Sequence, residues 1–283
     1  MDQFQGRVAV VTGGGSGLGR ELALCCARRG MTVALGDVDE PGMAETARLI
    51  GEERPEAACT AHRVDVSDAE AMEAFADAVW RRHGGVHLLF NNAGVAVNGP
   101  LWEHTTADWQ WLLGVNLHGV AWGIRAFVPR MIAQGTGYVV NTASAAGWVS
   151  APGSGIYNAS KSAVVALSET LALDLRDAGA DIGVSVVSPA FFPTPIAESE
   201  RNRPPELADT APMSEARRRR SEELRYAVQH GRIPAGDIAR MTLEAVEQRR
   251  FYVFPHGRIK ELVRARAEAV AREDDVFDTL AGR

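Results

Sequence analysis

The sequence predicts an α/β fold: a doubly wound, Rossmann-like parallel sheet of about seven strands with helices on both faces. Three observations predict it. Short apolar, β-branched runs lack polar alternation, as expected of strands buried on both faces. These runs alternate with helical patterns along the chain, and a glycine-rich turn follows the first of them. No linker or shift in composition divides the 283 residues, so we expect a single domain, residues 1–283.

Composition excludes several classes of protein. Hydrophobic residues make up 46% of the chain, enough for a sizeable core, and the net charge of −6 argues against a nucleic-acid surface. The basic run 217–220 has acidic neighbours, as on a solvated helix face. The N-terminus lacks a signal-peptide pattern and no apolar run of about 18 residues occurs, so we expect a cytoplasmic protein without a membrane segment.

The three cysteines give no sign of a metal site or a disulfide. Cys25 and Cys26 are adjacent within an apolar, helix-like run, and Cys59 stands alone. We expect reduced thiols in or near the core and no metal.

The first βαβ unit contains the elements of a dinucleotide site. Arg7 to Thr12 is the first strand, a helical pattern after the turn ends at Gly30, and Thr32 to Leu35 is the second strand. Glycines let the turn approach a pyrophosphate, whose charge is met by the N-terminus of the helix. The turn residues expected to bind the cofactor are Gly13, Gly15, Ser16, Gly17, Leu18 and Gly19.

Asp37 follows the second strand, 18 residues beyond Gly19. A carboxylate at this position accepts hydrogen bonds from the adenosine ribose hydroxyls and repels a 2′-phosphate. No Arg or Lys lies in the glycine turn or immediately after Asp37. The sequence therefore favours NAD as the cofactor and leaves NADP as the less favoured choice.

Strand and helix patterns continue through the middle of the chain. Helices are expected at 41–53 and 68–83, and short strands at 61–64 and 87–90. The sequence Asn91 to Gly94 follows the second of these strands, at the edge where open α/β sheets bind ligands. One long helix, Trp109 to Ala133, carries Asn116.

The stretch from Ser144 to Lys161 leaves a strand at 138–142, crosses a loop of small residues and enters a helix at 156–177. Tyr157 and Lys161 lie one turn apart on the same face of that helix. A nearby ammonium favours the phenolate, so we expect Lys161 to lower the pKa of Tyr157 from its ordinary value near 10. With Ser144 at the end of the strand, the pattern is typical of an acid/base site.

The C-terminal third combines regular elements with an irregular insertion. A strand at 182–187 is followed by small and aromatic residues up to Thr194. Residues 197–231 are charged, interrupted by proline and without strand periodicity, which predicts a substrate lid or a mobile insertion. Helices at 237–249 and 258–272 and a strand at 251–254 complete the chain.

Over nearly its whole length the chain resembles the short-chain dehydrogenase/reductase family. The T-G-x-x-x-G-x-G pattern stands at Thr12 to Gly19, N-N-A-G at Asn91 to Gly94, and Y-x-x-x-K at Tyr157 and Lys161. The resemblance implies an NAD-dependent oxidoreductase that moves a hydride between the nicotinamide and a secondary alcohol or ketone.

The resemblance also implies a role for each residue of the site. Tyr157 is the general acid/base, and Ser144 hydrogen-bonds the substrate oxygen. Lys161 binds the nicotinamide ribose as well as acting on Tyr157, and Asn116 holds a water that relays protons from Lys161 to solvent. Ala190 stands where the family usually has glycine, which stiffens the turn after the sixth strand. Beyond the glycine turn and Asp37, the implied cofactor contacts are Asp65, Val66, Asn92, Ala93, Gly94, Tyr157, Lys161, Pro189, Phe192 and Thr194.

The expected substrate pocket is apolar and partly aromatic. No Arg or Lys stands next to Ser144 or Tyr157 to bind a carboxylate. We expect an apolar, possibly aromatic, secondary alcohol or ketone, and the segments 127–135 and 254–263 resemble dehydrogenases of lignin-derived aryl alcohols. Trp148 serves equally well as a packing residue under the lid. The residues expected to contact substrate are Ser144, Ala146, Trp148, Tyr157, Phe191 and Tyr226.

Two alternatives remain open from the sequence. One is an NADPH-dependent reductase of keto or acyl substrates, which Asp37 argues against. The other is a non-catalytic NAD-sensing module. The presence of Ser144, Tyr157 and Lys161 together argues against it. Family members are often tetramers, so we expect a homodimer or homotetramer built on the helices that carry Asn116 and Tyr157.

Overall fold

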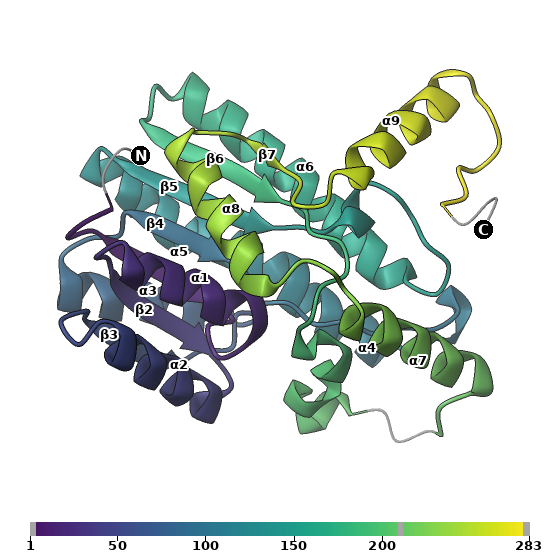
Figure 1. Ribbon diagram of the computed structural model, residues 1–283, viewed down its shortest axis with the longest axis horizontal. Helices are drawn as coiled ribbons and strands as arrows, with labels where there is room; N and C mark the ends of the chain where they lie inside the picture. The colour runs from purple at the N-terminus through teal and green to yellow at the C-terminus, as the bar shows by residue number, and fades with distance from the viewer. Residues whose placement is uncertain (1–3, 209–211, 280–283) are drawn as a thin grey trace.

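The structure is a computed structural model that describes residues 4–208 and 212–279. Within them, seven parallel strands form one sheet with the order β3-β2-β1-β4-β5-β6-β7, the doubly wound arrangement that the sequence predicts (Figure 1). The strands are β1 (Val8–Thr12), β2 (Thr32–Asp37), β3 (Cys59–Arg63), β4 (Leu88–Asn91), β5 (Gly137–Thr142), β6 (Ile182–Val187) and β7 (Tyr252–Val253).

Helices cover both faces of the sheet. One face carries α1, α2 and α8, and the other carries α3, α5 and α6 (Figure 1). The helices are α1 (Gly17–Arg28), α2 (Glu40–Glu53), α3 (Ala69–His83), α4 (Thr106–Leu113), α5 (Gly119–Gln134), α6 (Gly155–Asp177), α7 (Glu215–Gln229), α8 (Ala235–Glu247) and α9 (Arg258–Ala271).

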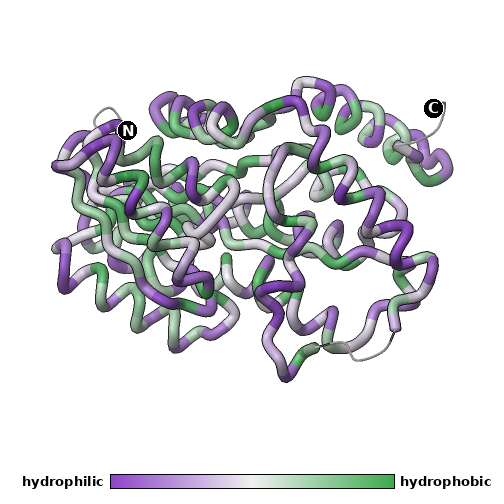
Figure 2. Tube along the Cα trace, turned by 60° about the horizontal axis from the view of Figure 1, so that its bottom comes forward, coloured by the Kyte–Doolittle hydropathy of each residue, from purple (hydrophilic) through white to green (hydrophobic). Residues whose placement is uncertain are grey.

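Each face of the sheet has its own hydrophobic core. Leu22 of α1, Met43 of α2 and Ile238 of α8 pack on one face, and Phe75 of α3 and Phe127 of α5 pack on the other. Strands buried on both sides need apolar residues at successive positions, which explains why the sequence shows continuous apolar runs. In Figure 2, hydrophobic (green) stretches of the chain pass through the interior, and hydrophilic (purple) positions are frequent on the outer helices.

The order of the strands places the site. The chain moves outward from β1 to β3 and then crosses back to β4, so β1 and β4 are neighbours in the middle of the sheet. At such a reversal the connections leave in opposite directions and a crevice opens beyond the carboxyl ends of the strands. The glycine turn after β1 and the Asn91–Gly94 segment after β4 both lie there.

Two elements differ from the sequence prediction. The helix expected at 109–133 begins at Thr106 and is interrupted by a π-helical turn, Gly114–His118, between α4 and α5. Helix α7 forms inside the segment expected to be irregular, with Ser214 as its N-cap, whose hydroxyl accepts from the Arg217 N–H. Its sequence is strongly charged, so its small apolar face is not visible as a hydrophobic period.

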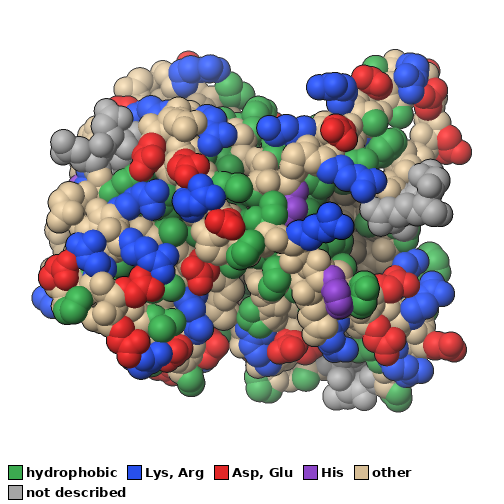
Figure 3. Space-filling view, viewed as in Figure 1, with side chains coloured by type: hydrophobic (Ala, Val, Ile, Leu, Met, Phe, Trp, Pro, Cys, Tyr) green, Lys and Arg blue, Asp and Glu red, His purple; other side chains and the backbone are tan. Residues whose placement is uncertain are grey.

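The cysteines lie in or near the core, and the surface carries charges of both signs. Cys25 and Cys26 are buried, Cys59 is partly buried, and all three are free thiols. On the face seen in Figure 3, acidic and basic side chains are interspersed. Several surface charges form ion pairs, such as Arg28 with Glu53. None of the helices in the described ranges is long and apolar enough to span a bilayer.

Candidate active site

The glycine turn packs tightly against the segment that follows β4. Gly13 has φ +68°, and a Cβ there would lie 2.8 Å from the Ala93 Cα; a Cβ on Gly19 would lie 1.9 Å from the Gly13 carbonyl oxygen. The Thr12 hydroxyl accepts hydrogen bonds from the backbone N–H groups of Asn92 (2.9 Å) and Ala93 (3.2 Å). Glycine is therefore required for the close approach of β1, α1 and the N-N-A-G segment.

Asp37 is fixed as a hydrogen-bond acceptor at the end of β2. Its carboxylate accepts from the backbone N–H groups of Asp39 (3.0 Å) and Gly15 (2.8 Å). Burial raises the pKa of Asp37, and these two hydrogen bonds oppose the rise. Gly15 thus orients the carboxylate and is not itself among the residues that line the cleft.

A continuous cleft runs along the carboxyl edge of the sheet from Asp37 to Lys161. Every other residue that the sequence assigns to the cofactor lines it: Gly13, Ser16, Gly17, Leu18, Gly19, Asp37, Asp65, Val66, Asn92, Ala93, Gly94, Tyr157, Lys161, Pro189, Phe192 and Thr194.

The donors and acceptors in this cleft suit a dinucleotide. Ser16 is the N-cap of α1, and its side chain makes no capping hydrogen bond, so the N–H groups of the first turn face the cleft without a side-chain acceptor. Asp37 supplies an acceptor at one end. At the other, Lys161 donates one hydrogen bond, to the Thr142 carbonyl oxygen at 2.8 Å, and keeps two N–H donors.

The Tyr157–Lys161 pair lies at the inner end of the cleft. The Lys161 Nζ is 5.7 Å from the centre of the Tyr157 ring, on the face that the one-turn spacing predicts. Lys161 is only 3% exposed, and burial lowers its pKa to about 8. The amine is therefore mostly protonated at neutral pH, although burying its charge lowers the stability of the fold.

The pKa of Tyr157 differs from the sequence prediction. Burial raises it above its ordinary value, and a hydrogen bond with Ser144 opposes the rise. The expected lowering by Lys161 is wrong for this structure, because desolvation of the phenolate outweighs any attraction from the neighbouring ammonium. Tyr157 is consequently a neutral phenol, a proton donor, at neutral pH.

Ser144 lies two residues after β5 with its hydroxyl loosely held. The Oγ accepts from the Ala146 N–H at 3.1 Å and donates to the Pro189 carbonyl oxygen at 3.4 Å. The second bond is long, so the hydroxyl proton can turn toward another acceptor at little cost. Ser144 also acts on Tyr157, as the pKa of the phenol shows.

Asn116 is fully buried in the π-helical turn. Its Oδ1 accepts from the Val95 N–H (2.8 Å), and its Nδ2 donates to the Val95 carbonyl oxygen (3.0 Å) and to the Ser160 hydroxyl (3.3 Å). The amide thus ties the loop after β4 to α6, beside the helix turn that carries Tyr157 and Lys161.

A second cavity, of about 380 Å³, opens beside the first. Ser144, Ala146, Tyr157 and Phe191 line it, as the sequence predicts. Its lining is mostly apolar and comes from the segments that follow β4, β5 and β6 and from α6, α7 and α9. Tyr157, Pro189, Phe192, Thr194 and Ile196 line both cavities, so the two meet at the tyrosine.

Comparison with known proteins agrees with this geometry. The family model for short chain dehydrogenases matches residues 7–205. The chain is a short-chain dehydrogenase. It is an oxidoreductase of a family that uses NAD or NADP, and the seven-stranded Rossmann-like sheet is that of its structural neighbours.

Relatives of this short-chain dehydrogenase cover nearly all of its length. A short-chain dehydrogenase/reductase from Burkholderia phymatum, solved in complex with NAD, is 45% identical with a TM-score of 0.97, covering 99% of this chain and 100% of that one. The CLA biosynthesis dehydrogenase/reductase of Lactiplantibacillus plantarum is 32% identical, covering 96% of each chain. The C alpha-dehydrogenase of a Sphingobium species is 34% identical, covering 95% of this chain and 87% of its own.

Two residues expected in the substrate pocket of the dehydrogenase lie elsewhere. The Trp148 ring packs against Tyr252 and Phe254, and its Nε1 donates to the Ser188 hydroxyl at 2.8 Å. Tyr226 is 65% exposed and stacks on His230, 4.0 Å between ring centres. Neither is among the residues that line the cavity.

Side chains from α7 and α9 take their places. Leu224 and Val228 of α7 and Ile259 and Leu262 of α9 line the cavity, with Arg258 as the basic side chain of the lining. Leu224 and Val228 are four residues apart and share a helix face, a signal that the charged sequence of α7 obscures. The sequence predicts that residues 197–231 cover the substrate pocket, but it does not indicate which face of α7 lines the pocket or that α9 takes part.

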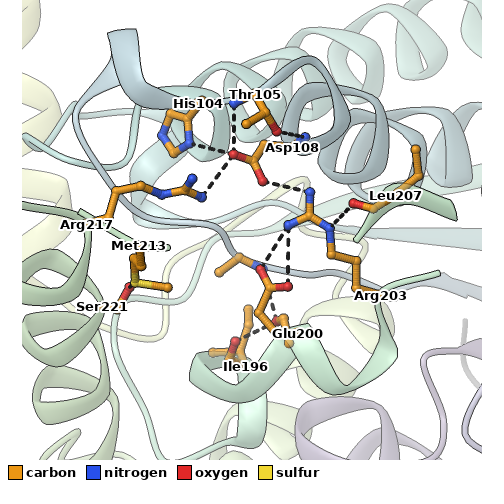
Figure 4. A network of polar contacts seen from close by, with 12 residues as sticks. His104, Thr105, Asp108, Ile196, Glu200, Arg203, Leu207, Met213, Arg217 and Ser221 are labelled. Carbon is orange, nitrogen blue, oxygen red and sulfur yellow. Dashed lines mark hydrogen bonds and ion pairs between the residues drawn. The ribbon is translucent and has the colours of Figure 1, made fainter. Parts of the chain in front are cut away.

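A buried ionic cluster, which sequence reasoning missed, joins the segment after β6 to α4 (Figure 4). Asp108 is fully buried; its carboxylate is 2.8 Å from Arg203 and 3.0 Å from Arg217, and His104 lies 3.6 Å away. We call these four residues the Asp108 cluster. Burial alone would raise the pKa of Asp108, but His104, Thr105 and the two arginines outweigh it and hold that pKa well below its usual range.

Proposed function

We propose that this short-chain dehydrogenase is NAD-dependent and transfers a hydride between the nicotinamide and an apolar, possibly aromatic, secondary alcohol or ketone. One observation carries the proposal: Tyr157 lies where the dinucleotide cleft and the apolar cavity meet. A proton donor at that junction can reach a substrate oxygen while the substrate carbon faces the cofactor.

Asp37 supports the choice of NAD. Its carboxylate is oriented by the Gly15 and Asp39 N–H groups and lines the end of the cleft that binds the adenosine ribose. A carboxylate there accepts hydrogen bonds from ribose hydroxyls and repels the extra phosphate of NADP. The Burkholderia phymatum relative, 45% identical, binds NAD.

The protein's own residues divide the acid/base work. When bound, the dinucleotide supplies the hydride donor or acceptor at its nicotinamide ring. Tyr157 gives its proton to the carbonyl oxygen in reduction and takes it back in oxidation. Ser144 turns its hydroxyl from the Pro189 carbonyl to the same substrate oxygen and stabilises negative charge there.

Lys161 and Asn116 support the exchange of that proton. The two free N–H donors of Lys161 bind the nicotinamide ribose hydroxyls beside Tyr157. Asn116 Oδ1 and Lys161 Nζ lie on the same side of Gly94, 3.4 and 3.6 Å from the position a Cβ would take there. A water held between the two groups completes a path for protons to solvent.

The cavity lining narrows the substrate. Alanine, valine, leucine, isoleucine and phenylalanine side chains surround the approach to Tyr157, which favours an apolar body. Arg258, exposed at the first position of α9, has no ion-pair partner among the described residues. Its positive charge favours apolar secondary alcohols or ketones that also carry an anionic group away from the reacting carbon.

The exposed apolar residues of two helices support an oligomer. Ile132 of α5 is 43% exposed and Leu173 of α6 is 54% exposed. We include in the proposal a homodimer or homotetramer that covers these helices, which sedimentation analysis tests directly.

The test is a panel of secondary alcohols with apolar and aryl groups, each as free acid and as methyl ester, assayed with NAD and NADP. We expect turnover with NAD and a higher kcat/KM for the acids. A clear preference for NADP contradicts the cofactor assignment, and equal kcat/KM for acid and ester contradicts the role of Arg258.

Tyr157→Phe is the matched test of mechanism. Removing the hydroxyl removes the proton donor, and we expect kcat to fall by about 10³-fold or more while the Kd for NAD stays within about twofold. Trp148→Phe is the control, since Trp148 lies outside both cavities. Turnover that survives in Tyr157→Phe removes the tyrosine from the mechanism.

A further inference from the structure

The segment that follows β6 contributes to the cofactor cleft as well as to the substrate cavity. Residues Pro195–Asn202 form a 3-10 helix whose side chains line the dinucleotide cleft opposite the glycine turn. Thr194 is already close to this turn, with its Cβ 3.4 Å from the position a Cβ on Gly17 would take. The lining residues of the segment are Pro195, Ile196, Ser199, Arg201 and Asn202, and Pro204 follows just beyond it.

This segment is held at both sides. Ser199 is buried, and its hydroxyl accepts from the Ala96 N–H at 3.1 Å and donates to the Ile196 carbonyl oxygen at 2.6 Å. Arg203 is anchored in the Asp108 cluster (Figure 4). Its guanidinium carbon also lies over the ring of Trp111, 5.0 Å from the ring centre. Arg201 lies between these two anchors, so its backbone position is determined.

The guanidinium of Arg201 is itself fixed in direction. Its Nη1 donates to the carbonyl oxygens of Pro195 and Glu198, both at 2.9 Å. Its Nη2 points to the hydroxyl of Ser16, at 3.5 Å. Among the described residues, Arg201 has no carboxylate partner.

Two positive ends therefore face each other across the cleft. Ser16 is the N-cap of α1, where the helix presents a partial positive charge and N–H groups without a side-chain acceptor. Arg201 is exposed, so water screens this repulsion, but an anion bound between the arginine and the helix N-terminus would be attracted by both. Arginine matches phosphate oxygens in geometry as well as in charge.

We propose that Arg201 binds the diphosphate of the dinucleotide cofactor and clamps it against the N-terminus of α1. The inference rests on the proposed function for its cofactor. The segment after β6 then supplies the basic group that the glycine turn lacks. The Asp108 cluster holds this segment, and therefore Arg201, in position.

Binding measurements separate this role from others. We compare Arg201→Met with Arg225→Met, an exposed arginine of α7 that lines neither cavity, so that net charge is matched. Titration calorimetry with NAD, ADP and adenosine gives each Kd without turnover. We expect Arg201→Met to weaken NAD and ADP by about tenfold or more and to leave adenosine unchanged, with partial recovery in Arg201→Lys.

The other outcomes overturn the proposal in distinct ways. Unchanged Kd for ADP in Arg201→Met, or equal weakening of ADP and adenosine, removes Arg201 from the diphosphate. Selective weakening of NADP, with ADP unaffected, places Arg201 at the ribose 2′ position instead. Failure of the wild-type chain to bind either NAD or NADP contradicts the proposed cofactor and is distinguishable from all of these.

Discussion

Lys161 and Asp108 are both buried charged groups, and their surroundings are opposite. Asp108 is fully buried between two arginines and accepts a backbone hydrogen bond besides. Lys161 is 3% exposed, donates to one carbonyl oxygen and has no carboxylate partner among the described residues. Opposite charges and a backbone hydrogen bond thus compensate the buried carboxylate of Asp108. No opposite charge among the described residues compensates the buried ammonium of Lys161.

The difference separates a structural charge from a functional one. Surrounding charges and hydrogen bonds hold the pKa of Asp108 low, whereas burial lowers the pKa of Lys161 to about 8. A compensated pair fixes chain segments relative to each other. An uncompensated ammonium destabilises the fold, and its position next to Tyr157 accounts for its presence, since active sites commonly hold groups with perturbed pKa values.

Removing the compensated charge has the largest expected effect on stability. Asp108→Asn leaves Arg203 and Arg217 buried around a neutral amide, and we expect the free energy of unfolding to fall by about 3–5 kcal/mol. Urea unfolding of wild type and Asp108→Asn at neutral pH measures this fall in the free energy of unfolding. A loss below about 1 kcal/mol would show that the cluster relaxes into solvent and that the contrast with Lys161 is smaller than its geometry indicates.

The uncompensated charge is tested by its pH dependence. The pKa of Lys161 is lowered from 10.5 to about 8, so between these values the unfolded chain binds the proton more tightly and stability rises with pH. We expect wild type to gain roughly 3 kcal/mol relative to Lys161→Met between pH 7 and pH 10.5. Lys260→Met, at an exposed position, is the control and should show no such divergence from wild type. Parallel pH curves for wild type and Lys161→Met contradict the buried, uncompensated ammonium.

The smallest effect is expected at the outer edge of the cluster. Glu200 pairs with Arg203 at 3.2 Å, but its side chain is 56% exposed. Glu200→Gln should change the free energy of unfolding by less than about 1 kcal/mol, because solvent screens this pair. Comparing the changes in the free energy of unfolding in Glu200→Gln and Asp108→Asn separates the contribution of burial from that of charge. A loss close to that of Asp108→Asn would mean that both carboxylates compensate Arg203 equally.

Local pattern was enough to predict most of the fold and the inner part of the site. β6 occupies the expected residues, and the other strands, together with α2, α3, α6 and α9, lie within about two residues of expectation. Helix α4 and the π-helical turn depart from the single long helix, and the π-helical turn carries the buried Asn116 amide, which has hydrogen-bond partners in two other segments. Such a change of register has no local signal.

The sequence by itself determined the alternation of strands and helices along the chain, the glycine turn with Asp37, and the one-turn spacing of Tyr157 and Lys161. Each depends on residues near one another in the chain, where backbone geometry relates spacing to direction. Only the tertiary structure decided the raised pKa of Tyr157, the turning away of Trp148 and Tyr226, the Asp108 cluster and the approach of Arg201 to Ser16. These depend on desolvation and on contacts between distant segments, and neither exists until the chain has folded.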